Sequence, residues 1–194
     1  AVQAGAVATK SVKEASSEVD FVVTMVPVGS NVREIFLEDG ILAAAAPGTV
    51  MIDSSTIDVG SAQAVHESAK SAGFNMIDAP VSGGVIGADA GTLTFMCGGD
   101  KDSFEKAKPI LQGMGKNVVH CGSGGLGQAT KICNNMLAGI NALAAAEAMT
   151  MGERLGVSPD ILYEVISTST GRSYIFETSN PMPDVCSTSP ANNK

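Results

Sequence analysis

The sequence contains no tryptophan, few aromatic residues and few histidines, and these absences limit the kinds of site it can build. Only 4% of its residues are aromatic, and only two are histidines. The four cysteines, Cys97, Cys121, Cys133 and Cys186, show neither a CxxC pair nor a regular spacing. A metal site and a disulfide framework are therefore not expected, and free thiols of this kind are typical of a reducing compartment.

Basic residues are also scarce, with 12 Lys and Arg against 20 Asp and Glu and a net charge of −8. Because the acidic residues are spread along the chain, no surface for nucleic acid or for an anionic membrane is expected. The sequence lacks an apolar run long enough to span a bilayer. The best candidate, 136–149, is interrupted by Asn141 and Glu147.

What the sequence does contain is a series of short apolar runs separated by helical patterns. Runs typical of buried strands occupy 21–26, 49–53, 74–77, 92–97 and 117–121. A Gly/Ala/Asp stretch at 85–91 is expected to be a loop. Strands that alternate with helices predict an α/β fold, a Rossmann-like and mostly parallel sheet covered on both faces.

After residue 122 the alternation stops, and only helices are expected. A long helix at about 124–155 is followed by a second helix, which Ser158 and Pro159 begin and which ends near 169–171. The sequence therefore predicts a Rossmann-type domain at 1–122 and an all-α domain at 123–194.

The run Gly122-x-Gly124-x-x-Gly127 has the spacing of the dinucleotide-binding fingerprint and lies between a strand and a helix. The acidic residue that the fingerprint requires would be Glu147, which lies inside the long helix and not after a second parallel strand. We therefore interpret these glycines as residues that let the helix pack closely against the sheet edge.

Ligands of open α/β sheets bind beyond the carboxyl ends of the strands, and four such ends carry suggestive residues. They are 26–31, Ser55 with Thr56, 82–84, and the turn that leads to Lys131. The hydroxyl and unshielded N–H groups of 82–84 suit a carboxylate, although taken alone an ordinary tight turn explains them better. Ser55 and Thr56 are most simply caps of a helix that runs to about residue 72.

Lys131, Asn134 and Asn135 project from one side of the long helix near its start. The simplest interpretation of such a lysine is a solvated surface residue. Near a helix N-terminus, however, a cation gains nothing from the macrodipole, and a lowered pKa would suit it to donate or accept a proton. The pattern indicates an α/β cleft enzyme with a candidate lysine acid/base.

Four motifs together resemble the β-hydroxyacid dehydrogenase family, in particular its 3-hydroxyisobutyrate dehydrogenase branch. They are Thr24-Met25-Val26-Pro27, Ile52-Asp53-Ser54-Ser55-Thr56, Asp78-Ala79-Pro80-Val81-Ser82-Gly83-Gly84 and Gly124-x-x-Gly127-x-x-x-Lys131-x-x-Asn134-Asn135. The hydroxyisobutyrate branch is favoured over the tartronate-semialdehyde and 6-phosphogluconate branches by the asparagine doublet, Ser169-Thr170-Gly171-Arg172 and Asn180-Pro181-x-Pro183.

The resemblance implies an oxidoreductase of valine and branched-chain amino acid catabolism, which oxidises 3-hydroxyisobutyrate to methylmalonate semialdehyde with NAD as cofactor. By resemblance, Lys131 is the catalytic residue. The implied substrate-binding residues are Ser82, Gly83, Gly84 and Asn135, and the implied cofactor-binding residues are Val26, Pro27, Asn31 and Thr56. A small 3-hydroxy acid substrate and a homo-oligomer formed through the helical domain are implied as partners.

Two features of the family have no match in this sequence. One is the Gly-rich phosphate loop with the strand-end acid that follows it, and the other is a further lysine of the helical domain. We therefore expect a chain that begins after the first βαβ elements, ends within the helical domain and binds NAD weakly or not at all.

Alternatives stay open at this point. One is a catalytically impaired form that acts only in assembly, and another is a sibling reductase of tartronate semialdehyde or glyoxylate. Without the strand-end acid the sequence does not decide between NAD and NADP. The resemblance implies the mitochondrial matrix, or the cytoplasm if the protein is bacterial.

Overall fold

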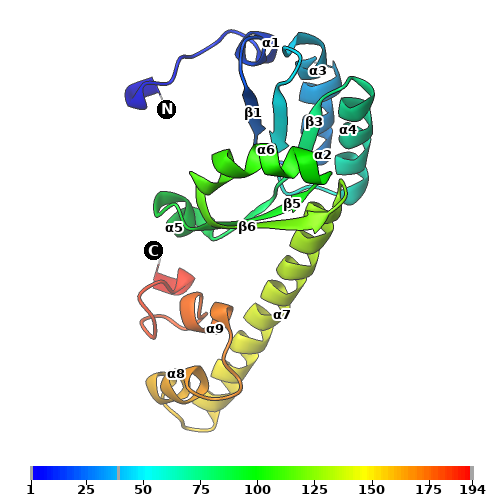
Figure 1. Ribbon diagram of the computed structural model, residues 1–194. Helices are drawn as coiled ribbons and strands as arrows, with labels where there is room; N and C mark the ends of the chain where they lie inside the picture. The colour runs from blue at the N-terminus through cyan, green and yellow to red at the C-terminus, as the bar shows by residue number, and fades with distance from the viewer. Residues whose placement is uncertain (1, 39, 193–194) are drawn as a thin grey trace. The chain divides into compact units, whose positions relative to one another are not determined.

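The computed structural model describes residues 2–38 and 40–192, and the chain divides into two units, Ala1–Ile132 and Cys133–Lys194 (Figure 1). The strands, all in the first unit, are β1 (Phe21–Thr24), β2 (Val50–Asp53), β3 (Asn75–Asp78), β4 (Val81–Ser82), β5 (Leu93–Gly98) and β6 (Gly115–Gly122). Its helices are η1 (Val2–Ala4), α1 (Val12–Ser16), α2 (Gly29–Arg33), η2 (Glu34–Glu38), α3 (Ile41–Ala44), α4 (Val59–Ser71), α5 (Gly84–Asp89) and α6 (Lys101–Gln112). Helix α7 (Leu126–Arg154) begins in the first unit and continues into the second, which adds α8 (Pro159–Ser167), α9 (Tyr174–Thr178) and η3 (Pro190–Asn192).

The sheet has the order β1-β2-β3-β5-β4, with β6 paired to β5. Strands β1, β2 and β3 run parallel, and their register places Thr24, Asp53 and Asp78 side by side at their carboxyl ends. Strand β5 runs antiparallel to β3 and β4, while β6 runs parallel to β5. The mixed, mostly parallel sheet confirms the predicted Rossmann-like α/β class. The antiparallel direction of β5 relative to β3 and β4 was not predicted.

Side chains are buried on both faces of the central strands, which explains why these strands are continuous apolar runs. All four residues of β2 are buried. Met51 packs in a cluster with Phe36 of η2 and Val65 of α4. The next residue, Ile52, points to the other face and packs in a second cluster with Phe104 of α6. Figure 1 shows α6 across one face of the sheet.

The structure corrects the predicted start of helix α4. Its N-cap is Asp58, whose carboxylate accepts the Ser61 N–H at 2.8 Å, and not Ser55 or Thr56. The Ser55 hydroxyl donates to Asp53 Oδ1 at 2.6 Å and accepts the Val26 N–H at 2.9 Å. Because this hydroxyl joins the ends of β1 and β2, it is not free to cap a helix.

The expected loop at 85–91 is also wrong, because Gly84–Asp89 forms helix α5. Its N-cap Gly83 has a φ of 137° and Gly84 a φ of 61°, which glycine adopts without the strain of a Cβ. Strand β4 precedes this turn and pairs Ser82 with Thr94 of β5. Ser82 therefore lies at the end of a short strand of its own.

The described part of the second unit is helical, as predicted, and has a small core of its own. Ala145 and Met149 of α7 and Phe176 of α9 are buried together, and Leu162 of α8 packs against them. The Tyr163 ring stacks on Phe176 with ring centroids 5.7 Å apart. Helix α9 was not predicted, and the Ser173 hydroxyl begins it by accepting the Phe176 N–H at 3.1 Å.

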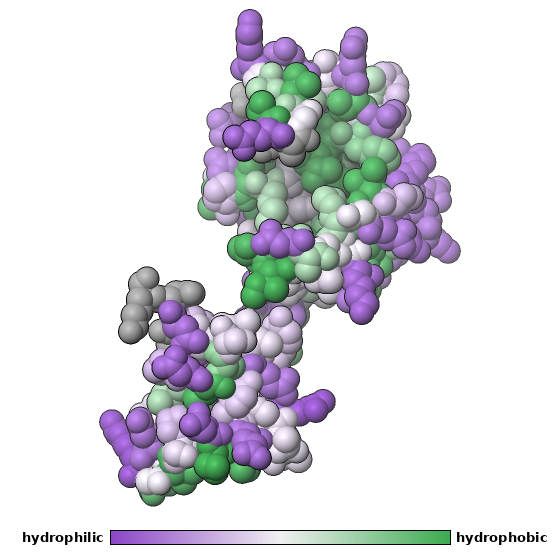
Figure 2. Space-filling view, turned by 90° about the vertical axis from the view of Figure 1, so that its left-hand side faces the viewer, coloured by the Kyte–Doolittle hydropathy of each residue, from purple (hydrophilic) through white to green (hydrophobic). Residues whose placement is uncertain are grey.

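Apolar side chains also reach the surface of both units (Figure 2). On the edge strand β1, Val23 is 46% exposed, and Met25 directly after it is 69% exposed. On α7 the exposed apolar residues of the second unit include Met136, Leu137, Ile140 and Leu143. Among the described helices, none is long and apolar enough to cross a membrane.

Candidate active site

A buried hydrogen-bond network joins the carboxyl ends of β1 and β2. Asp53, 1% exposed, accepts the Thr24 hydroxyl at 2.8 Å and the Ser55 hydroxyl at 2.6 Å, both on its Oδ1. Burial raises the pKa of the Asp53 carboxyl, and the bonds from Ser55 and Thr24 oppose that rise. The network holds the end of β1, where the 26–31 segment begins, next to the end of β2.

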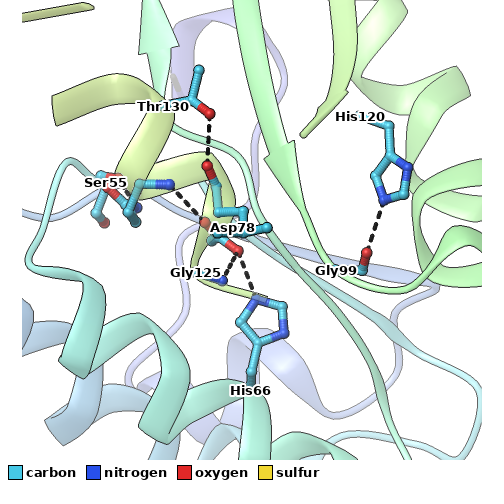
Figure 3. A network of polar contacts seen from close by, with 9 residues as sticks. Ser55, His66, Asp78, Gly99, His120, Gly125 and Thr130 are labelled. Carbon is cyan, nitrogen blue, oxygen red and sulfur yellow. Dashed lines mark hydrogen bonds and ion pairs between the residues drawn. The ribbon is translucent and has the colours of Figure 1, made fainter. Parts of the chain in front are cut away.

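The neighbouring strand end carries a second buried carboxylate, Asp78, which holds the start of α7. Its Oδ1 accepts the Gly125 N–H at 2.8 Å and its Oδ2 accepts the Gln128 N–H at 2.9 Å. The same Oδ1 lies 2.8 Å from Nε2 of His66 on α4. Figure 3 shows the carboxylate between the His66 ring and the Gly125 amide. Asp78 therefore caps the open N–H groups at the N-terminus of α7.

The glycines before and within α7 allow this close approach. A Cβ on Gly127 would overlap the Met96 carbonyl oxygen and lie 2.6 Å from that of Asp78. A Cβ on Gly124 would lie 2.5 Å from the His66 ring. The 122–127 run thus packs a helix against the strand ends, and among the described residues no further strand follows α7, as a dinucleotide-binding βαβ unit would require.

Gln128 ties the same turn to the segment that follows β2. Its side chain is completely buried, and its Nε2 donates to the Ser55 carbonyl at 2.7 Å while its Oε1 accepts the Ile57 N–H at 3.1 Å. The carboxamide therefore bonds the residues on both sides of Thr56. This contact was not predicted from the sequence.

Lys131 lies one helical turn after Gln128 and is 8% exposed. Desolvation by burial lowers the pKa of its ammonium group. Within the described residues it forms no hydrogen bond or ion pair that would restore its charged form. The neighbouring Thr130 is exposed, and its hydroxyl bonds back to the Leu126 carbonyl at 2.8 Å. A lysine in this environment is suited to exchange a proton.

Three of the predicted cofactor-binding residues, Val26, Pro27 and Thr56, follow the carboxyl ends of β1 and β2, and the fourth, Asn31, lies in helix α2. Val26 is half-buried and its N–H is already bonded to Ser55, whereas Pro27 and Thr56 are exposed. Within the described residues, the side chains of Asn31 and Thr56 form no hydrogen bond. The open surface and the free polar groups fit one part of a dinucleotide. Among the described residues, no glycine-rich strand–turn–helix precedes β1 for the pyrophosphate.

The predicted carboxylate-binding residues lie at a different place in the same unit. Ser82 is half-buried in β4, and Gly83 and Gly84 are exposed where α5 begins. A Cβ on Gly84 would meet nothing within 4 Å, so its backbone is open to a ligand. In the described structure, no hydrogen bond joins 82–84 to Lys131.

Asn134 and Asn135 lie on the part of α7 that belongs to the second unit, and both are exposed. The Asn134 Nδ2 is 3.4 Å from the Asn135 Oδ1. Lys131 is buried whereas the two asparagines are not, so the three polar residues of the helix do not share one environment.

A separate pocket of about 420 Å³ lies in the first unit. Its walls include His66, Lys70, Asp100 and Gly124. It contains none of the residues that the sequence predicted for substrate or cofactor, and its charged side chains are of both signs.

Sequence reasoning did not assign a role to Asp78, His66 or Gln128 in holding α7. The available signals were a carboxylate at the end of a strand and a carboxamide within the first turn of the long helix. Both are common features, and neither identifies its partner, which lies 47 to 73 residues away along the chain.

Comparison with known proteins gives two family matches. Residues 1–122 match the NAD binding domain of 6-phosphogluconate dehydrogenase, and residues 125–190 match the family described as NAD-binding of NADP-dependent 3-hydroxyisobutyrate dehydrogenase. The chain is 44% identical over 191 residues to the NAD-dependent L-serine dehydrogenase of Pseudomonas aeruginosa. It is 42% identical over 191 residues to the mitochondrial 3-hydroxyisobutyrate dehydrogenase of Homo sapiens.

A solved structure of 3-hydroxyisobutyrate dehydrogenase from Mycobacterium tuberculosis with L-serine superposes with a TM-score of 0.88 at 47% identity. The match covers 95% of this chain and 63% of that structure's chain. The two curated relatives are each matched by 98% of this chain, which spans 64% of the bacterial and 57% of the human protein. The chain therefore spans less than two thirds of the length of each of these three relatives.

Proposed function

Because this chain belongs to the 3-hydroxyisobutyrate dehydrogenase family of NAD(P)-dependent oxidoreductases, we propose that the protein oxidises 3-hydroxyisobutyrate to methylmalonate semialdehyde with NAD. The observation that carries the proposal is Lys131. It is a buried lysine without a charge partner in the described residues, on a helix fastened to the carboxyl ends of β2 and β3. An open α/β sheet binds its ligands at that edge.

In the proposed reaction Lys131 works as the proton acceptor. Its neutral amine takes the proton of the substrate hydroxyl while the hydride leaves the carbon that carries this hydroxyl, and the ammonium returns the proton in the reverse reaction. The bound nicotinamide supplies the hydride acceptor. Burial favours the neutral amine, which is the form that oxidation requires.

The remaining predicted residues have supporting roles in the proposal. Ser82, Gly83 and Gly84 hold the substrate carboxylate through a hydroxyl and backbone N–H groups, and Asn135 holds the substrate beside Lys131. Val26, Pro27, Asn31 and Thr56 hold the cofactor. We assign cofactor binding to a domain at 1–122 and the acid/base helix to a domain at 123–194.

A second candidate substrate is L-serine, which is also a 3-hydroxy acid. It is favoured by the relative named as an L-serine dehydrogenase and by the solved structure that contains L-serine. Serine differs from 3-hydroxyisobutyrate by an ammonium in place of a methyl group. The preference of the protein between the two substrates should therefore depend on how it binds the ammonium or methyl group and not on the oxidation step.

The proposal is tested by NADH formation with 3-hydroxyisobutyrate, L-serine and glycerate, each with NAD and with NADP. We expect kcat/KM to be highest for 3-hydroxyisobutyrate with NAD. A preference for L-serine would change the proposed substrate and leave the proposed oxidation unchanged. If glyoxylate or tartronate semialdehyde is reduced while 3-hydroxyisobutyrate is not oxidised, the sibling reductase is correct. If none reacts in a folded protein, the proposed oxidation fails for this chain, and the catalytically impaired form that acts only in assembly is correct.

We also propose a homo-oligomer formed through the helical domain, supported by the exposed apolar side chains of α7. The compartment is proposed to be the mitochondrial matrix for a eukaryotic protein, supported by the human relative, which is named as mitochondrial, and the cytoplasm for a bacterial one. Immunofluorescence or fractionation of the source organism would test it.

A further inference from the structure

Gln128 makes contacts that set it apart from the other polar residues of α7. Its backbone N–H is bonded to the Asp78 carboxylate at 2.9 Å, so its main chain is fixed to the end of β3. Its carboxamide donates to the Ser55 carbonyl and accepts the Ile57 N–H, so its side chain is fixed to the segment after β2. One residue therefore joins two strand ends to one helix turn.

The two groups that the carboxamide binds lie on either side of Thr56. Thr56 itself is exposed, and in the described structure its hydroxyl has no hydrogen-bond partner. Lys131 lies three residues beyond Gln128, on the neighbouring position of the same helical side. Gln128 thus connects a proposed cofactor contact and the proposed proton acceptor through only a few covalent and hydrogen bonds.

We propose that Gln128 is a positioning residue that sets the distance between the Thr56 segment and the Lys131 amine. The inference rests on the proposed function, because it gives Thr56 and Lys131 their roles on the cofactor and proton sides of one reaction. Proton and hydride leave the same alcohol group, so their acceptors must be held at a fixed spacing. Gln128 provides that spacing without itself touching substrate or cofactor.

A carboxamide is the side chain that this place requires. The buried site offers one acceptor, the Ser55 carbonyl, and one donor, the Ile57 N–H, and a glutamine bonds the first through its NH₂ group and the second through its carbonyl oxygen. A methionine has a similar length but leaves both backbone groups unpaired in a buried place. An asparagine is one methylene shorter and cannot reach both groups from a backbone fixed by Asp78.

The test compares Gln128→Met and Gln128→Asn with wild type in the 3-hydroxyisobutyrate reaction. We expect kcat to fall about 10–100-fold in Gln128→Met, since a misplacement of about 1 Å costs on that order. The fall in kcat should be smaller in Gln128→Asn. KM for the hydroxy acid should change by no more than about threefold, because groups that bind the ground state are retained. Hydrogen exchange of the Ile57 amide should become faster in both variants.

The matched control is Asn180→Leu. Asn180 is also completely buried, and its carboxamide likewise donates to a carbonyl, that of Phe176, and accepts an N–H, that of Met182. Asn180 lies in the second unit, so Asn180→Leu measures the effect of losing a buried carboxamide that does not bond the Thr56 segment. We expect Asn180→Leu to lower stability as much as Gln128→Met while kcat stays at the wild-type value.

Two results would overturn the inference. One is a wild-type kcat in folded Gln128→Met and Gln128→Asn, even where Ile57 exchange is faster, because the hydrogen bonds of the Gln128 carboxamide would then not position the reacting groups. The other is equal loss of kcat in Asn180→Leu, which would make the effect one of stability. A wild-type protein that oxidises no hydroxy acid would instead refute the proposed function, and the positioning role with it.

Discussion

At the scale of single residues, the most informative feature is a lysine whose surroundings disfavour its charge. Lys131 on α7 is 8% exposed, and desolvation by burial lowers the pKa of its ammonium group. No described residue offsets this with an ion pair. A charge kept in such a place at a cost in stability is typical of residues retained for their chemistry.

The first prediction concerns the stability of Lys131→Met. We expect the free energy of unfolding at neutral pH to rise by about 0.5–2 kcal/mol, the usual size of a single stabilising substitution, because the variant no longer buries a charge. Because the pKa of Lys131 is lowered by folding, the unfolded state binds more protons, and wild-type stability should increase with pH up to the unfolded lysine pKa of about 10.4. Urea unfolding at several pH values measures both effects.

The control for that experiment is Lys70→Met, since Lys70 is exposed on α4. Its substitution should leave the pH dependence as in wild type. If Lys131→Met is less stable than wild type at neutral pH, the side chain has favourable contacts that outweigh its desolvation, and the explanation given for its lowered pKa fails.

The second prediction concerns Asp53→Asn. The Asp53 carboxyl accepts all its hydrogen bonds on Oδ1, so an asparagine oxygen can replace it. Since burial raises the pKa of Asp53 on folding, its contribution to stability is lost as pH rises from about 4 through the folded pKa. At neutral pH we expect Asp53→Asn to be within about 1 kcal/mol of wild type or more stable.

Asp58→Asn is the matched control, because its carboxyl has the opposite shift. The hydrogen bond from the Ser61 N–H lowers the pKa of Asp58, so its contribution is present above the unfolded pKa and is lost as pH falls. The difference in free energy of unfolding between wild type and each variant, measured by urea unfolding from acid to neutral pH, should therefore change in opposite directions with pH for the two variants. The same trend in both would refute the assignment for Asp53.

At the scale of elements, the position of α7 depends on glycine. Gly127 lies where any Cβ would overlap the backbone of β3 and β5, while Gly139 of the same helix has open space around it. We expect Gly127→Ala to lower the free energy of unfolding by about 1–3 kcal/mol through overpacking. Gly139→Ala should raise it by about 0.5–1 kcal/mol, because alanine favours the helix. Thermal or urea unfolding followed by circular dichroism measures both, and equal effects would contradict the packing explanation.

The elements also show how far the sequence can be interpreted. Strand β2 was predictable because burial on both faces leaves a continuous apolar run, and α8 because Ser158 and Pro159 mark its start. Helix α5 was not predictable, since its glycine and alanine residues are also typical of a loop. The helix depends on the backbone conformation of its N-cap, Gly83. The sequence predicts Ser55 as a helix cap because its hydrogen-bond partner Val26 lies 29 residues earlier, and no local pattern indicates such a contact.

The candidate site divides in the same way. Lys131 and the 82–84 segment could be identified from residue type and from the resemblance. The clamp formed by Asp78 and Gln128 could not, because it depends on which strand ends come together, and that follows from the sheet order. The reversal of β5 against β3 at Asp78 and Gly98 brings β6, and with it the start of α7, to these ends.

At the scale of the whole molecule, the exposed apolar side chains of the helical unit bear on assembly. Ile140 is 55% and Leu143 63% exposed on α7. If the helical domain forms the proposed homo-oligomer, Ile140→Glu combined with Leu143→Glu should convert it to a monomer, because burying carboxylates costs several kcal/mol each. Sedimentation velocity measures the change. Leu37→Glu, a substitution at a partly exposed position of the first unit, is the control and should leave the mass unchanged.

The most direct test of the central claim is the pH dependence of NADH formation from 3-hydroxyisobutyrate by wild type and by Lys131→Met. For wild type we predict a rate that rises with pH as Lys131 loses its proton, with an apparent pKa below the ordinary lysine value of about 10.4. In Lys131→Met the rate should fall by about 10²–10⁴-fold and lose this ascending limb. A variant that keeps the wild-type rate and profile would show that Lys131 is not the proton acceptor.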